Sequence, residues 1–338
     1  MISPPSRPDV LTEAPTLVLS PHLDDALLSA STFALGPPCD VWTVFAGRPD
    51  PPRRTDWDVA CGFPDSDATM TARLAEDIAA FAGTPARVRR LDAWDGAYVE
   101  RDVRARQLGE VRAQIEEWLD TQARDAVLLA PAGAGVEVPD APWAGLQRRG
   151  GRRRLSVAAS VGSNGNGEEH PPLEPTTAGT AQARGAGATR LVRSAARTVG
   201  RLPLALAGRA LHAEYTLRRR RATAGGRLAP NPDHLALRDL ALAIAAERPD
   251  TQVVLYEELP YLWHGSADDA VAELCDSRDL VSTPWSEQVD TDAKFARLRA
   301  YTSQMPVMDT AGRLLAARHL PTRERYWLLT PSSRPTPS

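Results

Sequence analysis

Short apolar runs alternate with segments of helical periodicity over most of this 338-residue chain. Short apolar runs bounded by polar residues are typical of buried strands, and apolar residues three and four apart are typical of helices. The predicted strands are residues 16–20, 41–45, 88–91, 126–130, 252–256 and 326–329. The predicted helices are residues 25–35, 67–82, 101–121 and 234–247. This alternation predicts an α/β fold, a Rossmann-like three-layer sandwich with a mostly parallel sheet whose ligands bind beyond the carboxyl ends of the strands.

The helix predicted at 67–82 carries signals at both of its ends. Asp67 lies where it begins, and aspartate is a favoured residue at helix N-caps. Gly83 follows its last residue, and glycine commonly ends a helix. We therefore expect Asp67 to cap this helix and Gly83 to end it.

The alternating pattern breaks between about Leu146 and Arg227. This stretch contains too little apolar material to fold alone, so we predict one catalytic domain, residues 1–146 and 227–338, interrupted by a largely disordered, basic, low-complexity insertion, residues 147–226. Arg190, Arg193, Arg197 and Arg201 recur there at helical spacing. A basic helix of this kind could make a weak contact with a membrane surface or an acidic partner, although a solvated helix is the interpretation we favour.

Charge and cysteine content narrow the functional classes. From Arg148 to Arg221 there are 15 Arg, 4 Glu and no Asp, a net charge of +11, which leaves about −14 on the remainder of a chain whose total is −3. An acidic catalytic domain argues against nucleic-acid binding. The three cysteines are widely spaced and form no CxxC pair, and no apolar stretch resembles a signal peptide or a membrane span. We therefore expect reduced thiols and a cytoplasmic protein.

A histidine and two aspartates follow directly after the first predicted strand, in the segment Ser20-Pro-His22-Leu-Asp24-Asp25. A catalytic zinc needs three nitrogen or oxygen ligands, an open position and a nearby base, and the mouth of a parallel sheet is a suitable place for them. We expect His22 and Asp25 to converge on one ion while Asp24 points toward the substrate. The competing interpretation is that an aspartate caps the following helix and His22 is a buried loop residue.

A third ligand is expected from the segment Asn231-Pro-Asp-His234, which opens a predicted helix. A lone histidine at a helix start is usually structural, but His234 supplies the nitrogen ligand that the first segment lacks. Asp233 or another nearby carboxylate could orient its ring. Together the two segments favour a metal site over a purely structural role.

These segments resemble the two motifs of the PIG-L/LmbE-like family of zinc N-deacetylases, the second of which is usually His-x-Asp-His. Supporting similarity lies in residues 43–47, 73–77, 94–96 and 255–261. The resemblance covers about residues 14–135 and 228–330, that is, everything except the insertion and the tails. The occurrence of several motifs in the order found in the family indicates membership far more specifically than any single motif does.

The resemblance implies a role for each matching residue. His22, Asp25 and His234 would be the ligands of a Zn²⁺ ion. Asp24 would be the general base that deprotonates the attacking water and then the acid that protonates the leaving amine. Arg73 would grip sugar hydroxyls, together with Asp95, although an exposed side chain is an equally plausible interpretation of each.

The chain departs from the family pattern at two positions. Ala26 stands where the family often has Glu, and Asn231 stands where it commonly has a histidine that stabilises the oxyanion. Asparagine can donate a neutral hydrogen bond but carries no charge. His264 could substitute from a neighbouring loop. Glu257 and Glu258 follow the strand predicted at 252–256, and each could be either a pocket residue or an exposed carboxylate.

The expected function is a zinc-dependent hydrolase that removes an N-acyl group, expected to be acetyl, from an amino-sugar-containing small molecule or natural product. An amidase acting on a non-sugar or lipid-linked substrate is one alternative. A non-catalytic sugar-binding relative is another, and Asn231 would then mark lost catalysis. Asp24 argues against that last alternative, because a binding protein has no need of a base beside its metal.

Overall fold

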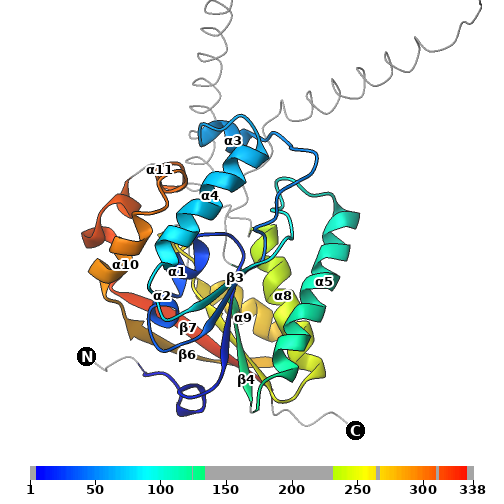
Figure 1. Ribbon diagram of the computed structural model, residues 1–338. Coiled ribbons are helices and arrows are strands. Elements are labelled where there is room, and N and C mark those ends of the chain that lie inside the picture. The colour runs from blue at the N-terminus through cyan, green and yellow to red at the C-terminus, as the bar shows by residue number, and fades with distance from the viewer. Residues whose placement is uncertain (1–4, 124, 134–230, 264–266, 310–311, 333–338) are drawn as a thin grey trace, which may run out of the picture. The chain divides into compact units, whose positions relative to one another are not determined.

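One mixed sheet forms the centre of the computed structural model, which describes residues 5–123, 125–133, 231–263, 267–309 and 312–332 (Figure 1). All of these belong to one compact unit, residues 1–137 and 219–338. The sheet has seven strands in the order β3-β2-β1-β4-β5-β7-β6. Their bounds are β1 Thr16–Ser20, β2 Asp40–Thr43, β3 Arg87–Arg90, β4 Ala126–Pro131, β5 Thr251–Tyr256, β6 Leu280–Gln288 and β7 Arg323–Pro331.

The first five strands of the chain run parallel to one another, and of the remaining two only β7 runs in the opposite direction. β2 pairs with β1 and β3, and β4 pairs with β1 and β5, all in parallel register. β7 runs antiparallel to both β5 and β6. The chain moves from β1 toward β3 on one side and then returns to β4 on the other, so the carboxyl ends of β1 and β4 border the crevice where such sheets bind ligands.

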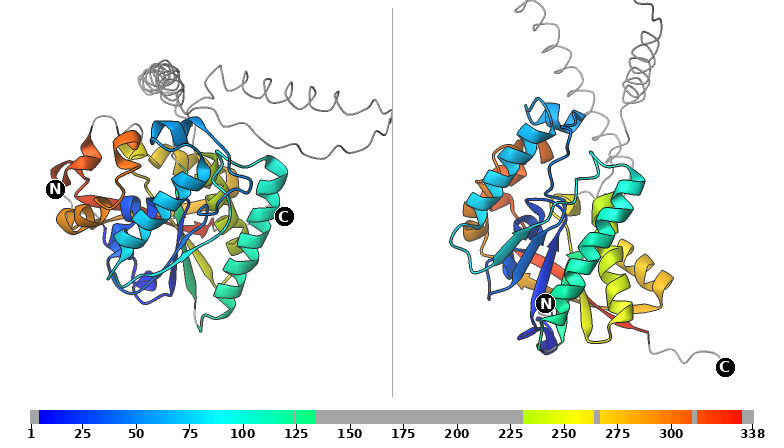
Figure 2. Two further views of the ribbon diagram at one scale, coloured as in Figure 1. Left: turned by 45° about the horizontal axis from the view of Figure 1, so that its top comes forward. Right: turned by 45° about the vertical axis from the view of Figure 1, so that its right-hand side comes forward.

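Helices cover both faces of the sheet (Figures 1 and 2). Leu17 and Leu19 of β1 pack into one cluster with α5, α8 and α9, whereas Val18 between them packs into the other cluster with α1, α2, α4, α10 and α11. The bounds of these helices are α1 Asp25–Ser29, α2 Ser31–Ala34, α4 Ser66–Phe81, α5 Arg101–Asp120, α8 Pro232–Glu247, α9 Ala267–Arg278, α10 Thr291–Leu298 and α11 Met305–Met308. A short helix, α3 Asp56–Ala60, precedes α4. The predicted three-layer sandwich with a mostly parallel sheet is confirmed.

Two local expectations need correction. The helix predicted at 25–35 is divided into α1 and α2 at Ala30, because the buried carboxylate of Glu324 accepts hydrogen bonds from the backbone N–H groups of Ser31 and Thr32, where the second helix begins. Helix α4 is capped by Asp65, whose side chain accepts from the N–H of Ala68, and not by Asp67. As predicted, Gly83 follows its end, with a φ of 72°.

The elements between β5 and β7 were not predicted from the sequence. Helix α9 and strand β6 have weak amphipathic patterns, since the burial along β6 does not alternate cleanly. The predicted insertion at 147–226 and the candidate residue His264 lie outside the described residues. In the part of the chain that is described, no helix combines the length and apolar character needed to cross a membrane.

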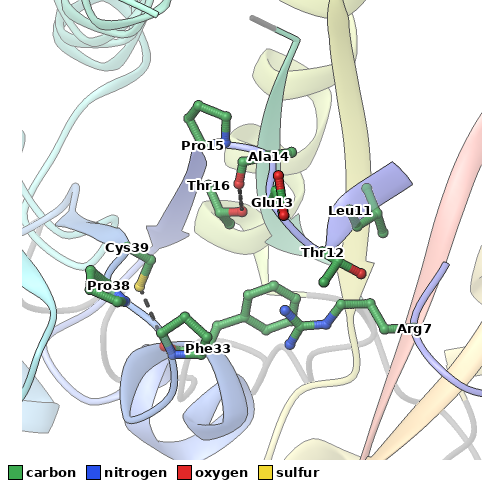
Figure 3. A pocket seen from close by; sticks show the side chains of 11 residues that line it. Arg7, Leu11, Thr12, Glu13, Ala14, Pro15, Thr16, Phe33, Pro38 and Cys39 are labelled. Carbon is green, nitrogen blue, oxygen red and sulfur yellow. Dashed lines mark hydrogen bonds between the residues drawn. The ribbon is translucent and has the colours of Figure 1, made fainter. Parts of the chain in front are cut away.

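A cavity of about 300 Å³ lies beside the amino ends of β1 and β2 (Figure 3). Arg7 lies along its wall, with its guanidinium 4.0 Å from the ring centroid of Phe33. The same guanidinium donates two hydrogen bonds to Glu287, at 2.6 and 2.8 Å. The charge of Arg7 is therefore already neutralised, and the candidate metal-binding residues lie at the other end of the strands.

Candidate metal centre

Three side chains from two distant segments converge just beyond the carboxyl end of β1. His22 follows β1, Asp25 is the first residue of α1, and His234 lies in the first turn of α8. Oδ2 of Asp25 lies 3.2 Å from Nδ1 of His22 and 3.4 Å from Nε2 of His234. One ligand atom from each of the three lies within 4.8 Å of the other two. The predicted set is thus close enough to share a single ion.

The orientation of the two imidazoles fits a cation between them. The outer nitrogen of each ring faces a carboxylate, Asp233 for His22 and Glu258 for His234. Each ring can therefore donate outward and turn its inner lone pair toward Asp25. Nε2 of His234 is buried and makes no hydrogen bond with any described residue. A buried nitrogen without a partner is costly, and a metal ion would satisfy it.

Of the carboxylates that the sequence left open, Asp233 or another nearby one, it is Glu258 that faces the ring of His234. Asp233 has Oδ2 3.0 Å from Nε2 of His22, so it acts on the first-loop histidine. Glu258, which follows β5 and is fully buried, has Oε1 3.2 Å from Nδ1 of His234. The oxygens of Asp233 also accept hydrogen bonds from the N–H of Gly96 and from Arg104.

Charge coupling in this cluster shifts the pKa values of its members. Burial alone would lower the pKa of His234, but Asp25 and Glu258 outweigh it and raise the pKa to about 9. The pKa of His22 is also raised, because nearby carboxylates outweigh burial. Burial would raise the pKa of Asp25, but the two histidines hold it below its usual range. The negative charge of Asp25 therefore favours a cation at the ring nitrogen of each histidine that faces it. A metal ion bound there would replace the proton on that nitrogen.

Asp24 lies beside this cluster, and one of its oxygens makes no hydrogen bond with a described residue. The residue is 4% exposed, and its Oδ2 makes no hydrogen bond with a described residue. The nearest cation is Arg73 of α4, whose Nη2 is 3.8 Å from that oxygen. Burial raises the pKa of Asp24 to about 6, against the opposing effect of Arg73. A carboxyl group with this pKa can both accept and donate a proton near neutral pH.

Arg73 and Asp95, which the family resemblance assigned to substrate, are both brought to the site. Nη1 of Arg73 lies 3.6 Å from Oδ2 of Asp95, which is also 3.6 Å from Nε2 of His22. The Arg73 side chain is 6% exposed and the Asp95 side chain 17% exposed. Asp95 is therefore the more accessible of the two, and Arg73 bridges Asp95 and Asp24 from below the surface.

Asn231 is the N-cap of α8. Its Oδ1 accepts a hydrogen bond of 2.9 Å from the backbone N–H of Asp233. Its side-chain oxygen is therefore used to begin the helix that carries His234, a structural task for which asparagine is among the best residues. The oxyanion-stabilising role suggested for this position remains a prediction.

Two glycines allow the backbone to approach the carboxylates closely. The N–H of Gly96 donates to Oδ2 of Asp233 at 2.8 Å, and the N–H of Gly133 donates to Oε1 of Glu258 at 2.7 Å. A Cβ at Gly96 would lie 2.7 Å from Oδ1 of Asp233, so no other residue fits without displacement. Gly133 adopts a φ of 82°, which also favours glycine. Each histidine thus has a carboxylate behind it, and each carboxylate is held by a backbone N–H.

The sequence left the role of Glu258 open and gave no indication of a role for Arg104. Glu258 was marked by its place at the carboxyl end of a central strand, although its burial was not evident. Arg104 of α5 contacts Asp233, but no motif or spacing marked it. In a chain where arginine supplies all but one of the 40 basic residues, a single arginine carries no signal.

No family model and no curated protein matches this sequence. Solved structures of deacetylases do share its fold. The zinc-inhibited form of teicoplanin deacetylase Orf2 has a TM-score of 0.53 and 19% identity, covering 95% of this chain and 99% of that one. A deacetylase–teicoplanin complex gives the same TM-score and identity over 95% and 100%. The A40926 pseudoaglycone deacetylase Dbv21 gives a TM-score of 0.50 and 19% identity over 95% and 99%.

Proposed function

We propose that this chain is a zinc-dependent N-deacetylase of the PIG-L/LmbE-like type. In this proposal His22, Asp25 and His234 hold one zinc ion, and Asp24 is the catalytic base. The substrate is an N-acylated amino sugar on a small molecule or natural product. Similarity of fold to deacetylases of teicoplanin and A40926 pseudoaglycone supports a glycosylated natural product as the substrate class.

The observation that carries the proposal is that Oδ2 of Asp24 and Nε2 of His234 both lack a hydrogen bond with the described residues. Both atoms are buried, and both lie next to Asp25 in the chain or in space. Buried polar atoms in folded proteins are almost always satisfied, so two exceptions at one place indicate a site that binds something polar. Hydrolysis requires a base that is not itself a metal ligand, and Asp24 is in that position.

The residues of the site divide the chemistry between them. When bound, zinc supplies Lewis-acid chemistry that polarises an acyl oxygen and makes water a better nucleophile at neutral pH. Asp24 accepts at Oδ2 the proton that water loses as the new C–O bond forms. The same oxygen then delivers that proton to the nitrogen as the C–N bond breaks. The products are a carboxylic acid and a free amine.

Two neighbouring residues tune and orient this step. Arg73 lowers the pKa of Asp24, against the larger effect of burial, and so keeps the carboxylate ionised when the reaction begins. Asp95 is partly exposed beside the site, and its carboxylate can accept hydrogen bonds from sugar hydroxyl groups. A non-catalytic role would leave unexplained why the buried Oδ2 of Asp24 makes no hydrogen bond with a described residue.

The direct test is amine release by the zinc-loaded full-length chain. N-acetylglucosamine derivatives and N-acylated aminosugar glycopeptides are supplied, and the free amine is measured. Asp24→Asn should retain one zinc per chain and lose about 10²–10⁴-fold in kcat, the usual effect of removing a general base. Asp67→Asn, at an exposed position on α4, is the matched control and should retain full activity.

Two outcomes would contradict the proposal. One is stoichiometric zinc with no amine released from any N-acyl amino sugar. The other is an Asp24→Asn variant that keeps wild-type kcat, which would remove Asp24 from the role of base.

A further inference from the structure

Arg104 lies next to the candidate metal centre, and its guanidinium donates a hydrogen bond to the carboxylate of Asp233. α5, which carries it, lies beside α8 (Figures 1 and 2). Nη2 of Arg104 is 2.5 Å from Oδ1 of Asp233, and Nη1 donates to the backbone carbonyl of Trp94 at 2.8 Å. Its guanidinium also lies 4.1 Å from the ring centroid of Phe45. These contacts fix the plane of the guanidinium, and only 14% of the side chain is exposed.

Hydrogen bonds to both oxygens of Asp233 fix the orientation of its carboxylate relative to His22. Its Oδ1 accepts from Arg104, and its Oδ2 accepts from the N–H of Gly96. A donor on each oxygen therefore holds Asp233 as a carboxylate. An ionised carboxylate can only accept hydrogen bonds. Nε2 of His22 must therefore be the donor in its 3.0 Å contact with Oδ2.

We propose that Arg104 is a positioning residue that sets the affinity of the metal centre, because it fixes Asp233 and thereby keeps the proton of His22 on Nε2. Nδ1 of His22 is then free to bind a cation on the side of Asp25. The inference uses the metal-binding part of the proposed function and is independent of the substrate. Arg104 acts through Asp233, which lies 129 residues later in the sequence.

The loop before α5 reinforces this arrangement. A Cβ at Gly96 would meet Oδ1 of Asp233 at 2.7 Å and Nη2 of Arg104 at 3.2 Å. The backbone of this loop therefore closes around the Arg104–Asp233 pair. Hydrogen-bonded partners behind a metal-binding histidine typically change metal affinity by about 10–100-fold when they are removed.

The test compares zinc affinity in variants of two arginines on the same helix. Arg104→Gln should weaken zinc binding by about 10–100-fold, measured by competition with a chromophoric chelator. Arg104→Lys keeps the charge but not the planar fork, so it should recover part of the affinity. Arg112→Gln is the matched control, since Arg112 of α5 pairs with Glu116 and Glu247 away from the site, and it should bind zinc as the wild type does.

A second readout reports the proton on His22 itself. In zinc-loaded protein with ¹⁵N-labelled histidine, Nε2 of His22 should carry a slowly exchanging proton in the wild type and in Arg112→Gln. That proton should exchange faster in Arg104→Gln. In an Asp233→Asn background, Arg104→Gln should cost much less affinity than it does alone, because the two residues act as one unit.

Wild-type zinc affinity in Arg104→Gln, with an unchanged His22 signal, would overturn the inference. An equal loss with and without Asp233 would do the same, since Arg104 would then act by another route. If Arg104→Gln fails to fold, Arg104→Lys and its combination with Asp233→Asn decide the question by the same criteria. None of these measurements involves substrate, so an absence of deacetylase activity would leave the inference standing.

Discussion

Two of the groups of buried charged residues in the described part of the chain differ in how completely their hydrogen bonds are made. At the metal centre, Asp24 and His234 each bury a polar atom that has no hydrogen-bond partner. In the second group, Lys294 of α10 donates to Oε1 of Glu324 on β7 at 2.7 Å. The same carboxylate accepts from Ser31 and Thr32, and from the hydroxyl of Tyr326. Both oxygens of Glu324 are therefore satisfied.

The difference separates a structural cluster from a functional one. Burial alone does not distinguish them, because Lys294 is 1% exposed and His234 is fully buried. A satisfied buried network stabilises one arrangement of the elements that contribute to it, here α2, α10 and β7. An unsatisfied network lowers stability, and this cost is relieved when the site binds something that the protein alone does not supply. The metal centre is of the second kind.

The largest effect on stability is expected at the satisfied cluster. Glu324→Gln leaves the charge of Lys294 buried without its partner, which should lower the free energy of unfolding by about 3–5 kcal/mol. Urea unfolding followed by circular dichroism measures this. Glu287→Gln is the control, because its ion pair with Arg7 is only partly buried and should contribute less than about 1 kcal/mol. Equal losses in the two variants would remove the contrast between the clusters.

The contribution of Glu324 should also depend on pH. Burial would raise its pKa, but Lys294, Ser31 and Thr32 lower it below the ordinary value of 4.5. A lowered pKa in the folded state means that the stabilisation is complete above pH 4.5 and is lost as the pH falls toward the folded pKa. The difference in unfolding free energy between wild type and Glu324→Gln should therefore be constant from pH 7 to about 5.5 and narrow below about 4.5. A difference that stays constant down to pH 3 would contradict this.

A smaller effect, on metal affinity and not on folding, is expected at Glu258. Glu258→Gln can present an amide N–H to Nδ1 of His234 and so disturb the ring that binds the metal. Zinc affinity should fall by about 10–100-fold. Glu257→Gln is the matched control: its side chain is 3.5 Å from Arg325, not at a histidine, and zinc binding should be unchanged. A loss in both variants would point to a general effect on the end of β5.

The smallest effect is expected at the start of α4. Asp65→Ala removes the N-cap and should lower the free energy of unfolding by about 1 kcal/mol. Asp67→Ala changes an exposed residue of the first turn and should cost less than about 0.5 kcal/mol. Thermal unfolding of the two variants side by side distinguishes them, and a larger loss for Asp67→Ala would show that the cap is wrongly placed.

The parts of the molecule that could be predicted from sequence are those with strong local signals. The buried strands β1, β4 and β5 are nearly continuous apolar runs, and the residues that follow β1 resemble a known motif. The break between α1 and α2 could not be predicted, because it depends on Glu324, about 290 positions later in the sequence. Strand β6 was missed because an edge strand with mixed burial has no clean period.

The candidate site shows the same limit. His22, Asp25 and His234 could be named because metal-binding residue types occur together at loop positions. The pairing of Asp233 with His22 could not be predicted, because residue 233 is adjacent to His234 in sequence and the choice between the two rings depends on where α5 places Arg104. Contacts between helices that are far apart in the sequence produce no recognisable pattern in the local sequence of either helix.

The most direct test of the account is anomalous diffraction at the zinc edge from crystals of the zinc-loaded protein. The account predicts one strong peak at about 2.0–2.2 Å from Nδ1 of His22, Nε2 of His234 and a carboxylate oxygen of Asp25. Nε2 of His22, Asp95 and Asp233 form a second group close enough to hold an ion. A peak in that group, with none between the two histidines, would contradict the assignment of the ligands.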